Sequence, residues 1–162
     1  MLHSVKKALI LLLGFFIVLS QSVFAAPHKA ILSYADLLNA LSIGNEVRAI
    51  INLNNCTSSS TGGNTNAGMS GLNFTQFNQY EILVGQEKRS GVATSITMLV
   101  ESSRFGHVYN YVRLRVFPDN SAVLTSQFLD PKTFALLSNT TFTCPLTVAG
   151  NQGGVNLYNL DG

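Results

Sequence analysis

The sequence has 162 residues, of which ten are lysine or arginine and eight are aspartate or glutamate, so the formal net charge is +2 at pH 7. A chain of this length is sufficient for one domain with its own hydrophobic core. Two of the lysines, Lys6 and Lys7, lie in an N-terminal segment that we expect to be removed, which leaves eight basic and eight acidic residues. This balance argues against nucleic acid or an acidic membrane surface as the partner, because both attract proteins with an excess of basic residues.

The first 25 residues have the pattern of a secretory signal peptide. Lys6 and Lys7 give a positive start, residues 8–19 are apolar, and Val23 and Ala25 supply the small residues of a cleavage site after Ala25. The apolar run is shorter than the roughly 20 residues of a membrane-spanning helix, which disfavours the alternative of an uncleaved anchor. We therefore predict a signal peptide at 1–25 and a single domain at 26–162, periplasmic or extracellular and without stable insertion in a membrane.

The first element of this domain is expected to be a helix over residues 33–41. Ser33 is a candidate N-cap, and Gly44 is well placed to end the helix. One helical face carries the apolar side chains of Tyr34, Leu37, Leu38 and Leu41. The helix should therefore pack through that face.

The remainder of the chain has the features of β-strands separated by turns. Seven segments fit this pattern: residues 47–53, 74–84, 92–103, 107–117, 121–129, 140–146 and 155–160. Residues 57–71 are mostly Ser, Thr, Gly and Asn, which predicts a flexible loop. Because the strands are joined by short turns without helical crossovers, we expect an α+β, mainly β, fold. The helix would pack on a curved antiparallel meander sheet or on a partly closed β-barrel of about seven strands.

The two cysteines, Cys56 and Cys144, both lie after the predicted cleavage site. An even number of cysteines in an exported chain favours a disulfide. A nucleophilic or metal-binding pair is the alternative, but the sequence has no CxxC motif and no histidine close to either cysteine.

No catalytic residue, metal ligand or cofactor is assigned from the sequence. The predicted domain contains only two histidines, His28 and His107, and it has no GxSxG motif. Its carboxylates are scattered along the chain: Asp36, Glu46, Glu81, Glu87, Glu101, Asp119, Asp130 and Asp161. A small extracytoplasmic hydrolase that uses a carboxylate pair or His107 stays open as an alternative.

One strand carries a candidate ligand-binding surface. Tyr109, Tyr111, Arg113, Arg115 and Phe117 alternate and so share one face of the strand; the first four are the candidate ligand-binding residues. Aromatic rings beside two guanidinium groups are suited to a planar, anionic or sugar-like ligand. The alternative is the ordinary solvent side of an antiparallel sheet, where Tyr and Arg are common.

The chain also resembles the VirK family of exported bacterial proteins. The resemblance rests on the segment LSYADLLNAL at 32–41, Gly44, VRAII at 47–51, Cys56-Thr57, YVRLRV at 111–116 and Cys144. It implies an exported protein linked to virulence, and it implies no catalytic residue. On this basis we expect a non-enzymatic binding or host-interaction factor with an envelope or host partner. An envelope assembly factor that acts through a sheet edge is a further alternative, and the oligomeric state stays open.

Overall fold

The computed structural model describes residues 28–61, 68–84 and 87–161. The predicted signal peptide lies outside these residues. The first half of the chain forms β1 (Lys29–Ile31), α2 (Tyr34–Ser42), β2 (Val47–Asn52), the 3-10 turn η1 (Leu53–Asn55), β3 (Thr57–Thr61), β4 (Met69–Asn73) and β5 (Asn78–Val84). The second half forms β6 (Glu87–Ser102), β7 (Gly106–Val116), β8 (Ser121–Leu129), β9 (Leu136–Pro145) and β10 (Val155–Asn159).

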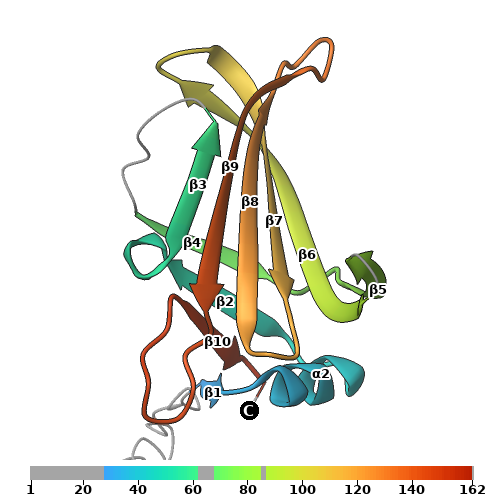
Figure 1. Ribbon diagram of the computed structural model, residues 1–162. Helices are drawn as coiled ribbons and strands as arrows, with labels where there is room; N and C mark the ends of the chain where they lie inside the picture. Colours follow the sequence, from blue (N-terminus) through green and yellow to red (C-terminus); the bar gives the residue numbers. More distant parts are fainter. Residues whose placement is uncertain (1–27, 62–67, 85–86, 162) are drawn as a thin grey trace, which may run out of the picture.

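These strands form two antiparallel sheets (Figure 1). The larger sheet has the order β3-β9-β8-β7-β6-β5, and its long central hairpins give it a tall, twisted shape. The smaller sheet has the order β1-β10-β2-β4 and lies beside one end of the larger sheet, together with α2. The prediction of a mainly β, antiparallel fold is therefore confirmed.

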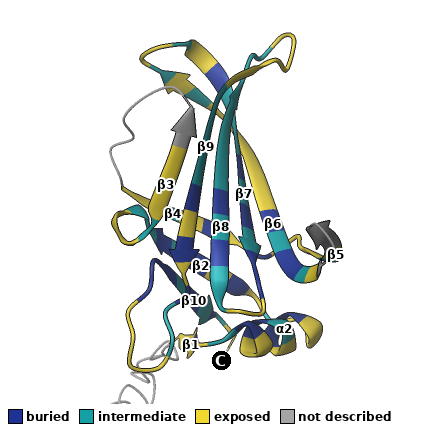
Figure 2. Ribbon diagram, in the orientation of Figure 1, coloured by how far each residue is buried: buried dark blue, intermediate teal, exposed yellow. Residues whose placement is uncertain are grey.

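The hydrophobic core lies between the two sheets and α2. Alternate residues of the long strands, such as Val112, Leu114 and Val116 of β7, are buried because successive side chains of a strand point to opposite faces. They belong to one cluster with the apolar residues of β2 and α2, among them Ile51 and Leu37. Figure 2 shows that burial is concentrated in the half of the larger sheet next to the smaller one, whereas the far half is mostly exposed or half-buried.

The predicted helix is present as α2, and local hydrogen bonds explain where it begins. The Ser33 hydroxyl accepts a hydrogen bond from the Asp36 backbone amide at 3.1 Å and donates one to the Asp36 carboxylate at 2.7 Å. An N-cap of this kind satisfies a backbone donor that the first helical turn leaves unpaired. The Tyr34 amide donates to the Asn120 side-chain oxygen at 2.8 Å, which ties the start of the helix to the β7–β8 turn.

The prediction of one seven-stranded sheet or a partly closed barrel is wrong in its topology. In the described part of the chain, β3 and β5 form the two outer edges of the larger sheet and do not pair with each other, so that sheet stays open. The predicted last strand, β10, pairs with β1 and β2 in the smaller sheet instead of extending the meander.

The predicted loop at 57–71 contains regular structure at both ends. β3 pairs with β9, and β4 pairs with β2, so backbone hydrogen bonds order segments whose side chains suggested a loop. β3 is polar because it is an edge strand with exposed residues such as Thr57 and Ser59. Residues 62–67, at the centre of the predicted loop, lie outside the described residues.

The predicted disulfide between Cys56 and Cys144 is confirmed, with the two Cα atoms 4.4 Å apart. It joins the segment that precedes β3 to the end of β9, and the Cys144 side chain is almost fully buried. A Cβ atom at Gly154 would lie 2.7 Å from the Cys56 sulfur and 3.2 Å from the Cys144 Cβ. Only glycine therefore fits at this position against the disulfide.

Candidate ligand-binding site

The predicted surface on β7 lies on the sheet face that points away from the core. The odd-numbered residues Tyr109, Tyr111, Arg113 and Arg115 are half-buried, whereas the even-numbered neighbours Val112 and Leu114 are buried. Phe117 was expected on the same face, but it follows the end of β7, where the alternation stops, and is buried. On the adjacent strand β6, Ala93 pairs with Arg115 and Ser95 pairs with Arg113. These small side chains leave space above β6 beside the arginines.

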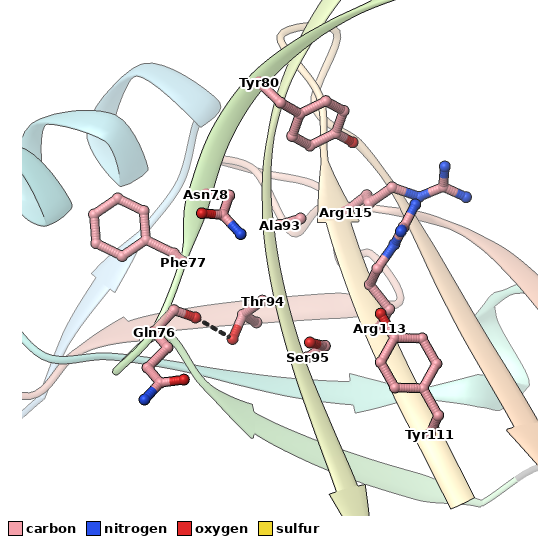
Figure 3. Close-up of a pocket in the computed structure, with 10 residues that line it drawn as sticks. All are labelled: Gln76, Phe77, Asn78, Tyr80, Ala93, Thr94, Ser95, Tyr111, Arg113 and Arg115. Carbon is pink, nitrogen blue, oxygen red and sulfur yellow. Dashed lines mark hydrogen bonds between the residues drawn. The ribbon is translucent and has the colours of Figure 1, made fainter. Parts of the chain in front are cut away.

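This space is a hollow of about 520 Å³, which is in the size range of small-molecule sites. It brings together residues of β5, β6, β7 and the connection that leads into β5 (Figure 3). The lining residues are Gln76, Phe77, Asn78, Tyr80, Ala93, Thr94, Ser95, Tyr111, Arg113 and Arg115. Three of the four predicted residues thus line one hollow. The fourth, Tyr109, is not among them and stacks on Phe134, with ring centroids 5.8 Å apart.

Tyr80 is an aromatic residue of the hollow that was not predicted from the sequence. It pairs across the strands with Gly91, and its ring covers that glycine. A Cβ atom at Gly91 would lie 3.1 Å from the Tyr80 hydroxyl oxygen and 3.1 Å from the Val116 carbonyl oxygen. A glycine inside a strand often marks such a close approach, so Gly91 was the available signal.

The two arginines of the hollow have no counter-charge in the part of the chain that the structure describes. Among the described residues, neither Arg113 nor Arg115 forms an ion pair, and no carboxylate lines the hollow. Being two residues apart on one strand, the two side chains start only about 7 Å from each other. Figure 3 shows them side by side, with the Tyr80 hydroxyl directed toward them. The result is a concentration of positive charge that no described carboxylate balances and that an anionic ligand could balance.

Two buried polar atoms in the hollow also lack a hydrogen-bond partner among the described residues: the Arg115 Nε and the Tyr80 hydroxyl. A buried donor without a partner costs about 1–3 kcal/mol. Burial raises the pKa of Tyr80, while the charges of Arg115 and Arg113 act in the opposite direction. The Tyr80 hydroxyl is therefore held in its neutral form at physiological pH and can donate a hydrogen bond.

The wall opposite the arginines is held in place by Thr94. Its hydroxyl oxygen lies 3.0 Å from the Asn73 carbonyl oxygen and 2.9 Å from the Gln76 carbonyl oxygen. These contacts fix the β4–β5 connection against β6, so Gln76 and Phe77 occupy defined positions at the rim. The hollow is thus lined by arginine, tyrosine, serine and amide side chains, a set that is rich in donors for an acceptor-rich ligand.

Comparison with family models shows that residues 30–134 match the model described as VirK protein. The chain belongs to the VirK family. The matched region extends from β1 into the turn after β8 and includes every residue that lines the hollow. The VirK family is associated with virulence, so this chain belongs to a virulence-associated family.

A solved structure has the same fold. The crystal structure of a VirK family protein from Legionella pneumophila superimposes with a TM-score of 0.60 at 14% sequence identity, covering 80% of this chain and 98% of that chain. No curated protein gives a significant match.

The residues considered for a hydrolase lie elsewhere on this VirK protein. None of the described carboxylates or histidines lines the hollow. His107 pairs with Glu101 across β6 and β7, but both residues are exposed. Asp130 accepts hydrogen bonds from the Lys132 and Thr133 amides, and Asp119 accepts from the Ser121 hydroxyl, so both carboxylates stabilise turns.

The described residues contain no group of three or more His, Cys, Asp or Glu side chains that could hold a metal ion. Among the helices of the same residues, none is long and apolar enough to cross a membrane.

Proposed function

We propose that this VirK-family protein is an exported, non-enzymatic binding protein that holds an anionic ligand in the hollow on β5, β6 and β7. The single observation that carries the proposal is the pair of arginines, Arg113 and Arg115, half-buried beside Tyr80 with no carboxylate of the described residues in the hollow. Guanidinium groups bind carboxylates and phosphates through paired hydrogen bonds of favourable geometry. A bound anion would balance the two charges and accept from the unpartnered Arg115 Nε and Tyr80 hydroxyl.

Export is part of this proposal. The pattern of residues 1–25 and the disulfide between Cys56 and Cys144 both favour a compartment outside the cytoplasm, because disulfides persist in oxidising surroundings. The intact mass of protein purified from its own host tests it. A mass for residues 26–162 less two hydrogens is expected, and a mass that retains residues 1–25 would contradict cleavage.

The binding proposal is tested by titrating the oxidised protein with galacturonic acid and, separately, with inorganic phosphate, followed by amide chemical shifts. We expect shifts centred on β7 near Arg113 and Arg115. The double variant Arg113→Gln/Arg115→Gln should lower the affinity about tenfold or more, because both charge-assisted hydrogen bonds are lost. Lys29→Gln/Lys132→Gln, which removes two positive charges at exposed residues outside the lining of the hollow, is the control for net charge. Unchanged binding by the double variant would remove the site assignment.

A second candidate is an envelope assembly factor that pairs through the free edge of β6. β5 pairs with β6 only up to Ala93, and residues 95–99 of β6 are all exposed, including Ile96, Met98 and Leu99. Exposed apolar strand edges are sites of β-strand pairing between chains. Self-association is the simplest form to test, by sedimentation at increasing concentration. A concentration-dependent dimer that Ile96→Lys abolishes would support this candidate, and a monomer throughout would count against it.

A further inference from the structure

A second hollow lies next to the first and extends the site beyond the residues discussed so far. Its volume is about 500 Å³, and its walls come from β2, β4, β6 and the β4–β5 connection. It shares Gln76, Thr94 and Ser95 with the first hollow. The two hollows therefore adjoin one another at these three residues.

The two hollows adjoin at the point where β5 stops pairing with β6. The last pair between β5 and β6 is Asn78 with Ala93, so β6 has a free edge from the next residue onward in the described chain. The first hollow reaches Arg113 and Arg115 on β7, whereas the second reaches Gly71 and Leu72 on β4. A molecule that fills both must cross β6. An added β-strand would run along β6 instead, so strand pairing does not account for this shape.

The second hollow contains its own cation, Arg48 of β2. The Arg48 Nε donates a hydrogen bond to the Asn73 side-chain oxygen at 3.0 Å, and the two residues are paired across β2 and β4. This bond orients the guanidinium group and leaves its terminal nitrogens as donors. No described carboxylate lines the second hollow either.

The surface between the two cationic ends is uncharged and mostly polar, with Ile96 as an exposed apolar residue of the second hollow. It presents the hydroxyl of Thr75, the amide of Gln76 and the hydroxyl of Ser95, with Phe77 at the rim of the first hollow. Hydroxyl and amide groups beside an aromatic ring are suited to the hydroxyl groups and apolar faces of sugar rings. Positive charge at both ends requires negative charge at intervals along the ligand.

We propose that the ligand is an acidic oligosaccharide that crosses β6 and occupies both hollows. One carboxylate is bound by Arg113 and Arg115, and another, further along the sugar chain, is bound by Arg48. This inference rests on the proposed function, because the Arg113/Arg115 end is the anion site proposed above. It adds the chemical class of the ligand, its length and a third cationic residue.

The test compares galacturonic acid with its linear tetramer by calorimetry on the oxidised protein. The tetramer should bind about tenfold more tightly than the monomer, because a second tethered contact forms at high effective concentration. Maltotetraose, which is neutral and of equal length, should not bind measurably. Tetraglutamate tests whether an acidic peptide is accepted instead, and affinity equal to that of the tetramer would overturn the assignment to a sugar.

Arg48 variants separate this inference from the proposed function. Arg48→Gln should lower the affinity for the tetramer about fivefold, as for loss of one exposed ionic contact, and leave the amide shifts that the monomer causes near Arg113 and Arg115 unchanged. It should also weaken the salt dependence of tetramer binding, which a merely structural effect would not do. Arg48→Lys should restore part of the affinity, and Lys132→Gln alone is the charge control.

The outcomes are distinguishable. If the monomer binds but the tetramer binds no better, or Arg48→Gln leaves tetramer binding unchanged, the inference of an extended ligand is wrong and the proposed anion site stands. If neither sugar binds the wild-type protein but inorganic phosphate does, the inference of an acidic oligosaccharide is wrong and the anion site stands; if none of the three binds, both are wrong. Melting temperature measured for each variant establishes that the fold is intact.

Discussion

Among changes that substitute no residue, reduction of the disulfide should cause the largest decrease in the free energy of unfolding. Cys56 and Cys144 are 88 residues apart in sequence, so the bond closes a long loop in the unfolded chain. In the chain-entropy description, cross-linking a loop of this length stabilises the folded state by about 4–5 kcal/mol. For a domain of this size, that corresponds to a decrease in melting temperature of roughly 10–20 °C on reduction.

The assay is urea denaturation of the same protein with and without a phosphine reductant. The oxidised protein should unfold at the higher urea concentration, and its m-value should be lower because the cross-linked unfolded chain exposes less surface. The Cys56→Ala/Cys144→Ala variant is the matched control, since the reductant should not alter its unfolding. An unchanged midpoint for the wild-type protein would refute the reasoning and show that packing around the sulfur atoms, with Gly154 against them, holds the structure without the bond.

Three further predictions follow from local contacts. Gly91→Ala should destabilise the protein by about 1–3 kcal/mol in urea denaturation, because the new methyl group is crowded by a backbone oxygen and by the Tyr80 ring; an equal or greater stability would contradict the close approach. Ser33→Ala should cost about 1 kcal/mol through loss of the helix N-cap, measured in the same way, whereas a neutral effect would mean that the capping hydrogen bond contributes little. Burial raises the pKa of Tyr80 in the folded state. The neutral hydroxyl group therefore contributes fully to stability below the pKa of about 10 that tyrosine has in the unfolded chain, and this contribution is lost as the pH rises through the pKa of the folded state. Stability should therefore fall in this alkaline range, and Tyr80→Phe should remove that part of the pH dependence.

Local features of the fold were predictable where the signals that determine them lie close together in the sequence. The N-cap, apolar face and terminal glycine fixed α2 to within a residue at each end, because all three signals lie close together in sequence. The alternation in β7 predicted correctly that Tyr111, Arg113 and Arg115 share a face. The pairing of Cys56 with Cys144 followed from the even cysteine count together with the predicted export of the chain.

Pairing between distant segments was not predictable. β10 lies between β1 and β2, and nothing in its five residues specifies those neighbours over the end of the larger sheet. β3 was interpreted as a loop because its residues are Thr and Ser, and it becomes a strand through backbone bonding to β9. The same limit applies to the site. Tyr80 reaches the first hollow through the pairing of β5 with β6. Arg48 of β2 reaches the second hollow because β2 pairs with β4, which lies beside β6.

The central position of β10 also sets the order in which this protein can complete its structure. β10 follows all the other described strands in the chain, yet it is the strand that joins β1 to β2, with Lys29 paired to Asn159; β2 also pairs with β4 on its other side. The larger sheet, built mostly from consecutive hairpins, can form from local contacts as the chain emerges, whereas the smaller sheet is complete only after β10 has been synthesised. A chain that still lacks β10 therefore leaves β1 unpaired and part of the shared core uncovered, which favours aggregation until β10 is added.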